Sequence, residues 1–257
     1  MLRTNAIKAK LARGDEVFGL FCSIPDATLV ELIGCAGYDL VILDSEHTLV
    51  DPQQLEHLIR AAEAVELTPF VRVPEQAPNA ILRALDAGAM GVVVAHVRRR
   101  SDVDAAIQAA RYAPLGMRSL NGGRVPGFGR IELTEYVRLA NEEVMLIAMI
   151  EDAEGVDDLP AILAGGGIDV VLEGAADLSQ SYGVPWQTRH PLVRAALQRV
   201  QATCVAHGVP FCAIPRTLED QQAWRADGVT AFVLGEERGL AARALRSHLS
   251  AHRGEAP

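Results

Sequence analysis

The 257-residue chain lacks several features that would place it in other classes of protein. It has only four cysteines, with no Cys-x-x-Cys pair and no nearby histidine at ligand spacing, so neither a disulfide framework nor a structural zinc site is expected. A reducing cytoplasm fits this cysteine usage best. No apolar run approaches the roughly 20 residues that span a bilayer, and the first residues do not resemble a signal peptide. We therefore expect no membrane association.

Positive charge is also scarce, since 24 Lys and Arg face 33 Asp and Glu, which gives a formal net charge of -9. Nucleic-acid-binding proteins carry a basic surface that competes for phosphates, so nucleic acid is not expected as a partner. The one local exception is the arginine cluster at 98–100, which we interpret as a solvated loop, the alternative being contact with a phosphate. No G-x-G-x-x-G or P-loop pattern is present.

What the chain does contain is a series of eight short apolar, strand-like runs. They cover residues 17–23, 39–44, 68–73, 91–95, 144–151, 169–174, 210–214 and 231–234. Continuous apolar runs indicate strands covered on both faces, as in parallel sheets, and the length is close to the roughly 250 residues of a (β/α)8 barrel. We therefore predict that residues 1–257 form a single (β/α)8 TIM barrel domain.

The segments between these runs are mostly helical in pattern. Residues 51–64 and 191–207 are amphipathic, and Asp51 and Thr217 are placed to cap helices. A further helix at 236–252 has a broad apolar stripe that could close its own barrel or pack on another subunit. The glycine-rich stretch at 114–130 is predicted to be a functional loop that covers the site or reaches a neighbouring subunit.

Charged residues follow several of the apolar runs. Asp44-Ser45-Glu46-His47 ends the second run, Arg72 lies in the third, Glu151 ends the fifth, and Asp177 follows the sixth. Because the carboxyl ends of barrel strands meet at one face, where ligands bind, these side chains are predicted to share a site.

Glu151 and Asp177 are candidate metal ligands, because carboxylate oxygens suit a hard divalent cation such as magnesium or manganese. The alternative for Asp177 is a helix cap. Arg72 carries a guanidinium fork that suits a carboxylate or an enolate oxygen. The alternative for Arg72 is a buried ion pair with Glu46 or Glu151.

His47 is a candidate general base, with Asp44 or Asp86 available to orient it. The alternative is a histidine that merely occupies the turn before the next helix. A lone histidine would favour that alternative, but four such groups on one face favour a catalytic site.

Several longer motifs carry a resemblance to a known family. They are Gly37-Tyr38-Asp39, Asp44-Ser45-Glu46-His47, Val71-Arg72, Leu85-Asp86-Ala87-Gly88, Arg111-Tyr112-Ala113-Pro114-Leu115-Gly116-Met117-Arg118, Ile150-Glu151 and Gly174-Ala175-Ala176-Asp177-Leu178-Ser179. With these motifs the chain resembles the metal-dependent (class II) pyruvate aldolases of HpcH/HpaI type, which include 4-hydroxy-2-oxoheptanedioate and 2-dehydro-3-deoxyglucarate aldolases.

The resemblance implies a carbon–carbon lyase that acts on small 2-oxo acids through an enolate stabilised by magnesium, manganese or cobalt. It also implies a homo-oligomer, often a hexamer that exchanges terminal helices. The roles that it implies are metal binding by Glu151 and Asp177, enolate stabilisation by Arg72, a base dyad of His47 with Asp86, and substrate binding by backbone amides near Gly174 and Ala175.

Two departures from the family pattern bear on the substrate. Met149 replaces a usual glutamine, and Ala175 replaces a usual proline in a motif that Glu173 precedes. One alternative is therefore the siderophore-pathway citrate synthase, a branch of the same fold that condenses oxaloacetate with acetyl-CoA. A second alternative is a non-catalytic barrel that binds carboxylates, against which the His47 and Asp86 pair argues.

Overall fold

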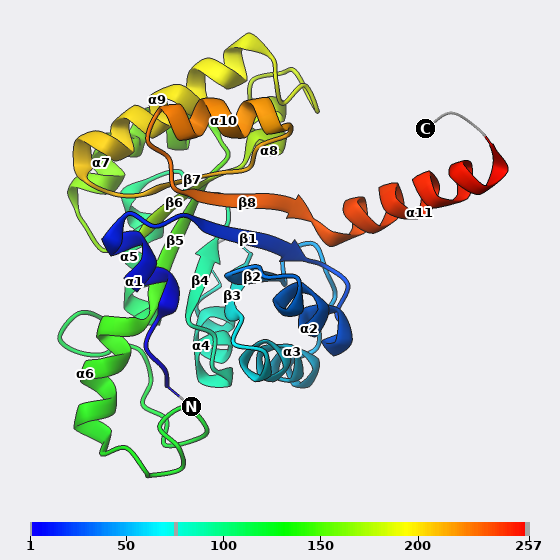
Figure 1. Ribbon diagram of the computed structural model, residues 1–257. Coiled ribbons are helices and arrows are strands. Elements are labelled where there is room, and N and C mark those ends of the chain that lie inside the picture. The colour runs from blue at the N-terminus through cyan, green and yellow to red at the C-terminus, as the bar shows by residue number, and fades with distance from the viewer. Residues whose placement is uncertain (1, 75–76, 255–257) are drawn as a thin grey trace.

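The computed structural model describes residues 2–74 and 77–254, which form a closed barrel of eight parallel strands (Figure 1). Each strand pairs with the next along the chain, and the last pairs with the first. The predicted (β/α)8 barrel is thereby confirmed. Within the described ranges, no helix is both long and apolar enough to cross a membrane.

All eight strands fall on the predicted apolar runs, with ends that differ by a few residues. They are β1 (Val17–Cys22), β2 (Leu40–Asp44), β3 (Thr68–Val73), β4 (Gly91–Val94), β5 (Met145–Ile150), β6 (Val170–Glu173), β7 (Phe211–Ala213) and β8 (Ala231–Glu236). Glu151 therefore lies one residue beyond its strand, and β8 extends further than its apolar residues alone predict.

The helices surround this barrel. They are α1 (Ala6–Arg13), α2 (Ala27–Cys35), α3 (Pro52–Ala64), α4 (Pro78–Ala87), α5 (Arg100–Ala110), α6 (Leu133–Glu143), α7 (Ala153–Ala164), α8 (Ala175–Ser181), α9 (Pro191–His207), α10 (Leu218–Ala226) and α11 (Glu237–Arg253). The predicted caps are confirmed, since Asp51 accepts from the Gln54 amide and Thr217 from the Asp220 amide.

Two buried cores lie on opposite faces of the strands. On β2, Leu40 and Ile42 belong to the core inside the barrel, whereas Val41 and Leu43 belong to the core between barrel and helices. Successive side chains of a strand alternate between its two faces. Asp44, two residues after Ile42, therefore falls on the inner face at the carboxyl end of β2.

The glycine-rich stretch at 114–130 lies at the opposite end of the barrel. Arg124 pairs with Glu63 in the last turn of α3 and donates to the carbonyl of Ala87 at the end of α4. These helices run antiparallel to the strands, so they end at the amino-terminal face. The prediction that this stretch covers the site of its own chain is therefore wrong, and contact with a neighbouring subunit stays a prediction.

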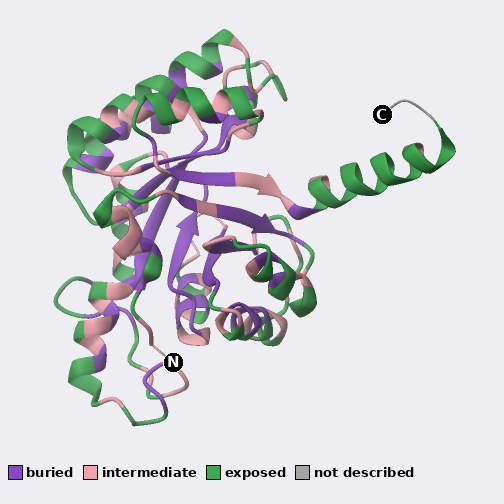
Figure 2. Cartoon of the chain, in the orientation of Figure 1, coloured by how far each residue is buried: buried purple, intermediate pink, exposed green. Residues whose placement is uncertain are grey.

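Helix α11 projects away from the barrel (Figure 1), and most of it is coloured green, as exposed, in Figure 2. Glu237 is its one buried residue, while Leu245 is 70% exposed. The first of the two predicted roles, closing its own barrel, is therefore wrong. Packing on another subunit stays a prediction.

Candidate active site

The carboxyl ends of the strands surround a cavity of about 150 Å³. Its lining includes Arg72 from β3, Glu151 after β5, Asp177 in the first turn of α8, and Arg216 after β7. Five of the predicted site residues, Arg72, Glu151, Gly174, Ala175 and Asp177, therefore border one space. That position agrees with the rule that ligands bind at the carboxyl ends of barrel strands.

Arg72 is buried and held by two carboxylates. Its Nε and Nη2 lie 2.9 and 2.8 Å from the two oxygens of Asp44, and its Nη1 lies 3.2 Å from Glu46. The guanidinium also stacks over the ring of Phe21, at 4.7 Å from the ring centre. Nε and Nη2 face Asp44, whereas Oε2 of Glu46 forms an ion pair without a hydrogen bond, so the guanidinium keeps N–H donors for a ligand in the cavity.

Asp44 and Glu46 both form ion pairs with Arg72, and the pair with Asp44 changes the pKa of that carboxyl group. Burial would raise the pKa of Asp44, but the hydrogen bonds and positive charge of Arg72 outweigh it and lower the pKa. Of the predicted alternative ion pairs of Arg72, the one with Glu46 is present. Asp44 is a further partner, and neither pair blocks the remaining donors.

Glu151 is a buried carboxylate whose environment disfavours its charge. Burial is the main cause that raises its pKa to about 7, and the negative charges of Glu46 and Asp177 add to it, against the opposing effect of His96. Its Oε1 accepts a 2.8 Å hydrogen bond from the His96 amide. Asp177 is partly buried in α8, whose N-cap is Gly174, so the helix-cap alternative for Asp177 is wrong.

These two residues fit a divalent cation. The ring of His96, 3.8 Å from Oε1 of Glu151, is the positive group beside this carboxylate, and the charges of Glu46 and Asp177 add to the negative side. A cation between Glu151 and Asp177 would offset that negative charge. No group of three or more His, Cys, Asp or Glu in the described part of the chain has the geometry of a metal site. Two protein oxygens that leave the other positions to water and substrate are typical of magnesium sites.

His96 is a candidate site residue that the sequence analysis missed. Its ring Nδ1 lies 2.9 Å from Asp152, and its Nε2 lies 3.6 Å from Glu46. The backbone at His96 has a φ of 51°, which turns the chain so that its amide reaches Glu151. The signal was present, because the run Val92-Val93-Val94-Ala95 ends in this histidine.

His47 and Asp86 are not brought together within the chain. His47 is exposed, with its ring 3.7 Å from Glu46, and Asp44 accepts from its backbone amide rather than from its ring. Asp86 instead pairs with Arg118 at 2.7 Å and accepts from Asn121 at 3.1 Å. The separation follows from topology, because Asp86 is the ninth residue of α4, roughly 12 Å along its axis toward the amino-terminal face.

The segment from Glu173 to Ala175 separates the catalytic cavity from a second one. The Gly174 amide donates to the carbonyl of Ile150, so of the two predicted amides only that of Ala175, the first residue of α8, is open to a substrate. A Cβ on Gly174 would lie 2.6 Å from Oε2 of Glu151. Gly174 therefore makes room for the carboxylate of Glu151.

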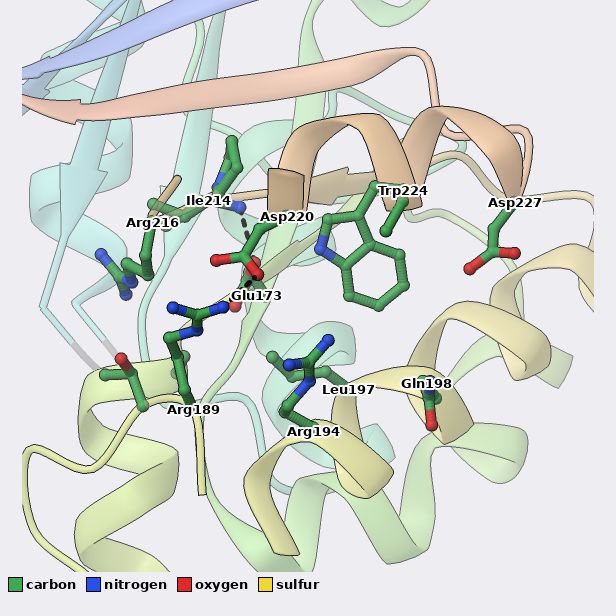
Figure 3. Close-up of a pocket in the computed structure, with 14 residues that line it drawn as sticks. Glu173, Arg189, Arg194, Leu197, Gln198, Ile214, Arg216, Asp220, Trp224 and Asp227 are labelled. Atoms are coloured by element: carbon green, nitrogen blue, oxygen red, sulfur yellow. Dashed lines mark hydrogen bonds and ion pairs between the residues drawn. The ribbon is translucent and has the colours of Figure 1, made fainter. Parts of the chain in front are cut away.

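Glu173 points to the other side of the barrel wall. It is buried and accepts a 2.6 Å hydrogen bond from the Ile214 amide, and burial raises its pKa to about 7. The second cavity, of about 70 Å³, is drawn in Figure 3 with Glu173, Arg189, Arg194, Arg216 and Asp220 around it. Glu173, the carboxylate that precedes the Gly174–Asp177 motif, therefore lies outside the catalytic cavity.

The arginine cluster at 98–100 has partners within the chain. Arg99 pairs with Glu154 at 2.5 Å, and Arg98 with Asp152 at 3.1 Å. Arg100 pairs with Asp104 and donates to carbonyls at the end of α7. These contacts support a structural role rather than the alternative of phosphate binding.

Comparison with known proteins agrees with this geometry. The family model of the HpcH/HpaI aldolase/citrate lyase proteins matches residues 17–244. The chain belongs to this family. Enzymes of the family depend in general on a divalent metal ion, and a barrel of the same fold was solved with oxaloacetate and magnesium.

Two relatives and one solved structure illustrate the range of the family. A pyruvate aldolase from Rhizobium etli is 35% identical over 77% of each chain. A 5-keto-4-deoxy-D-glucarate aldolase from Shigella dysenteriae is 29% identical over 92% of each chain. The crystal structure of the citrate synthase SbnG is 44% identical, with a TM-score of 0.90, and the match covers 96% of this chain and 97% of that one. The predicted resemblance is confirmed, and the chain is an enzyme of this family.

Proposed function

We propose that the protein is a divalent-metal-dependent enzyme that makes or breaks a carbon–carbon bond beside the carbonyl group of a 2-oxo acid. The observation that carries this proposal is the convergence of Arg72, Glu151 and Asp177 on one cavity. Glu151 and Asp177 would hold magnesium, manganese or cobalt. Such an ion, when bound, acts as a Lewis acid that polarises a carbonyl oxygen.

The other residues of the cavity bind and orient the 2-oxo acid. Arg72 directs its remaining N–H donors at the oxygen on which negative charge develops, and Asp44 and Glu46 hold the guanidinium in place. The amide of Ala175 donates to the substrate carboxylate. The side chains of Phe21 and Met149 form an apolar wall of the same cavity and limit access of water to it.

Two reactions share this site, and the 44% identity to SbnG favours citrate-type condensation. In that reaction a base removes a proton from the methyl group of acetyl-CoA, and the methyl carbon attacks the keto carbon of oxaloacetate. The keto oxygen takes up the electron pair and then a proton. Water then cleaves the thioester bond, which releases citrate and the thiol of CoA. The second candidate is aldol cleavage to pyruvate, which the aldolase relatives favour.

The base is proposed to be His47 in a dyad with Asp86. Because a single chain places His47 after β2, at the carboxyl-terminal face, and Asp86 near the end of α4, toward the amino-terminal face, the dyad requires two copies of the chain. A homo-oligomer is also favoured by α11, which leaves its own barrel with Leu240, Leu245 and Leu249 exposed. We propose a hexamer that exchanges these helices, in the reducing cytoplasm that its four free cysteines suit.

The proposal is tested by two assays on the purified protein, each with magnesium and with a chelator. One follows thiol release from acetyl-CoA with oxaloacetate, and the other follows pyruvate release from 4-hydroxy-2-oxo acids. Metal-dependent thiol release supports the condensation, and metal-dependent pyruvate release supports the aldolase. Metal-dependent binding of a 2-oxo acid without turnover in either assay would support the non-catalytic barrel and refute the proposal.

The oligomer is tested by light scattering on the wild-type protein and on Leu245→Glu. We expect a hexamer that the substitution dissociates. A wild-type monomer would refute both the helix exchange and the dyad.

A further inference from the structure

One of the positively charged side chains that line the catalytic cavity has no ion-pair partner. Arg72 is paired with Asp44 and Glu46, and Glu236 is paired with Arg238 at 2.6 Å. Glu151 and Asp177 are the proposed metal ligands. The remaining charge belongs to Arg216, whose guanidinium has no hydrogen bond or ion pair to any residue in the described ranges.

The backbone around Arg216 is fixed on both sides. Two residues before it, the Ile214 amide donates to the buried carboxylate of Glu173. One residue after it, Thr217 caps the first turn of α10. Arg216 is thus an exposed side chain on a short, anchored loop at the mouth of the cavity. A side chain in that place can meet a ligand without any movement of the main chain.

The surroundings of Arg216 offer its guanidinium no ion-pair partner, although its charge acts on Glu173. Figure 3 shows it at the edge of the second cavity, where Arg189 is the residue that pairs with Asp220, at 3.4 Å. The positive charge of Arg216 opposes the rise of the Glu173 pKa that burial causes, but Glu173 is hydrogen-bonded to Ile214 and forms no ion pair with Arg216. Arg216 therefore borders both cavities with its five N–H donors available.

We propose that Arg216 binds the remote carboxylate of a dicarboxylic 2-oxo acid and selects such an acid over a monocarboxylic one. This inference rests on the proposed function, which places the 2-oxo acid end of the substrate at Arg72, Glu151 and Asp177. A guanidinium binds a carboxylate through two parallel hydrogen bonds, which gives orientation as well as affinity. A substrate without the second carboxylate leaves Arg216 in water and gains nothing from it.

The test compares oxaloacetate with pyruvate, which lacks the remote carboxylate. Binding of each acid to the full-length protein with magnesium is measured by calorimetry on freshly prepared solutions. Arg216→Gln removes the charge, and Arg216→Lys keeps the charge without the planar fork. Arg194→Gln is the matched control, because Arg194 lines the second cavity but not the catalytic one.

We expect Arg216→Gln to weaken oxaloacetate binding on the order of tenfold to a hundredfold, the usual effect of losing hydrogen bonds to a charged group. Pyruvate binding should change by less than about twofold, Arg216→Lys should recover part of the oxaloacetate affinity, and Arg194→Gln should match the wild type. Equal losses for both acids, or unchanged oxaloacetate binding, would overturn the inference. Failure of the wild-type protein to bind either acid with magnesium would instead refute the proposed function.

Discussion

The carboxyl group of Glu173 makes a pH-dependent contribution to the stability of the protein, and Glu173→Gln should remove that contribution. Burial raises its pKa to about 7 from an ordinary value of 4.5. Between these two values the folded protein keeps the proton and the unfolded chain loses it, so unfolding releases a proton. The free energy of unfolding therefore falls as the pH rises from 4.5 to 7 and levels off above 7.

The size of the effect follows from the difference between the two pKa values. Each pH unit of difference corresponds to about 1.4 kcal/mol, so 2.5 units correspond to about 3 kcal/mol. The side chain is 2% exposed, so solvent screening does little to reduce this figure. Glutamine keeps an oxygen that accepts from the Ile214 amide and never ionises. The free energy of unfolding of Glu173→Gln, relative to that of the wild type, should therefore rise by up to about 3 kcal/mol when the pH is raised from 5 to 8.

The measurement is urea unfolding at pH 5 and pH 8, followed by tryptophan fluorescence at one fixed protein concentration. Trp224, which borders the same cavity as Glu173, is a suitable reporter. Glu31→Gln, at an exposed carboxylate on α2, is the control and should leave the pH dependence as in the wild type. Equal pH dependence in wild type and Glu173→Gln would refute the reasoning, because it would mean that the folded state does not hold the proton.

Three further changes test the site and its support. Gly174→Ala should weaken manganese binding roughly tenfold or more in calorimetry, because the new Cβ displaces Glu151. Gly122→Ala is the control, since a Cβ there meets open space and should leave the affinity unchanged. Equal manganese affinities of the two variants would count against the metal site. Glu237→Ala should lower the free energy of unfolding by about 2 kcal/mol in urea, since its carboxylate accepts from two backbone amides, and an unchanged midpoint would contradict this. Arg72→Lys should lower kcat about a hundredfold with manganese affinity kept; full activity would exclude its role.

The barrel could be predicted from sequence because its strands are buried on both faces. Such strands read as unbroken apolar runs, and eight of them at regular spacing leave few other folds. The residues next to their carboxyl ends could be predicted for the same reason. His96 follows this rule as well as His47 does, and it was missed because β4 ends without the acidic residues that mark the end of β2.

The partners of the site residues could not be predicted in the same way. His47 and Asp86 belong to two of the motifs that carry the family resemblance. However, α4 places Asp86 toward the amino-terminal face of the barrel, where Arg118 and Asn121 bind it. The arginines at 98–100 are interpreted from sequence as a solvated loop, and their ion pairs and the helix-end carbonyls that Arg100 binds are not evident there. Apart from the local pair of Arg100 with Asp104, these contacts join elements far apart in the chain, and local sequence does not encode them.

The two buried glutamates show how the pleat of a strand divides the chemistry of the barrel. Met145, Ile147 and Met149 face the inside on β5, so Glu151 falls on the inner face with the metal site. Val170 and Leu172 face the inside on β6, so Glu173 falls on the outer face, although both glutamates follow apolar runs. Glu173 is thus kept out of the catalytic cavity, where it holds Ile214 and with it the loop that presents Arg216. A carboxyl group on the outer face of the barrel wall can in this way position the arginine that binds substrate at the catalytic cavity.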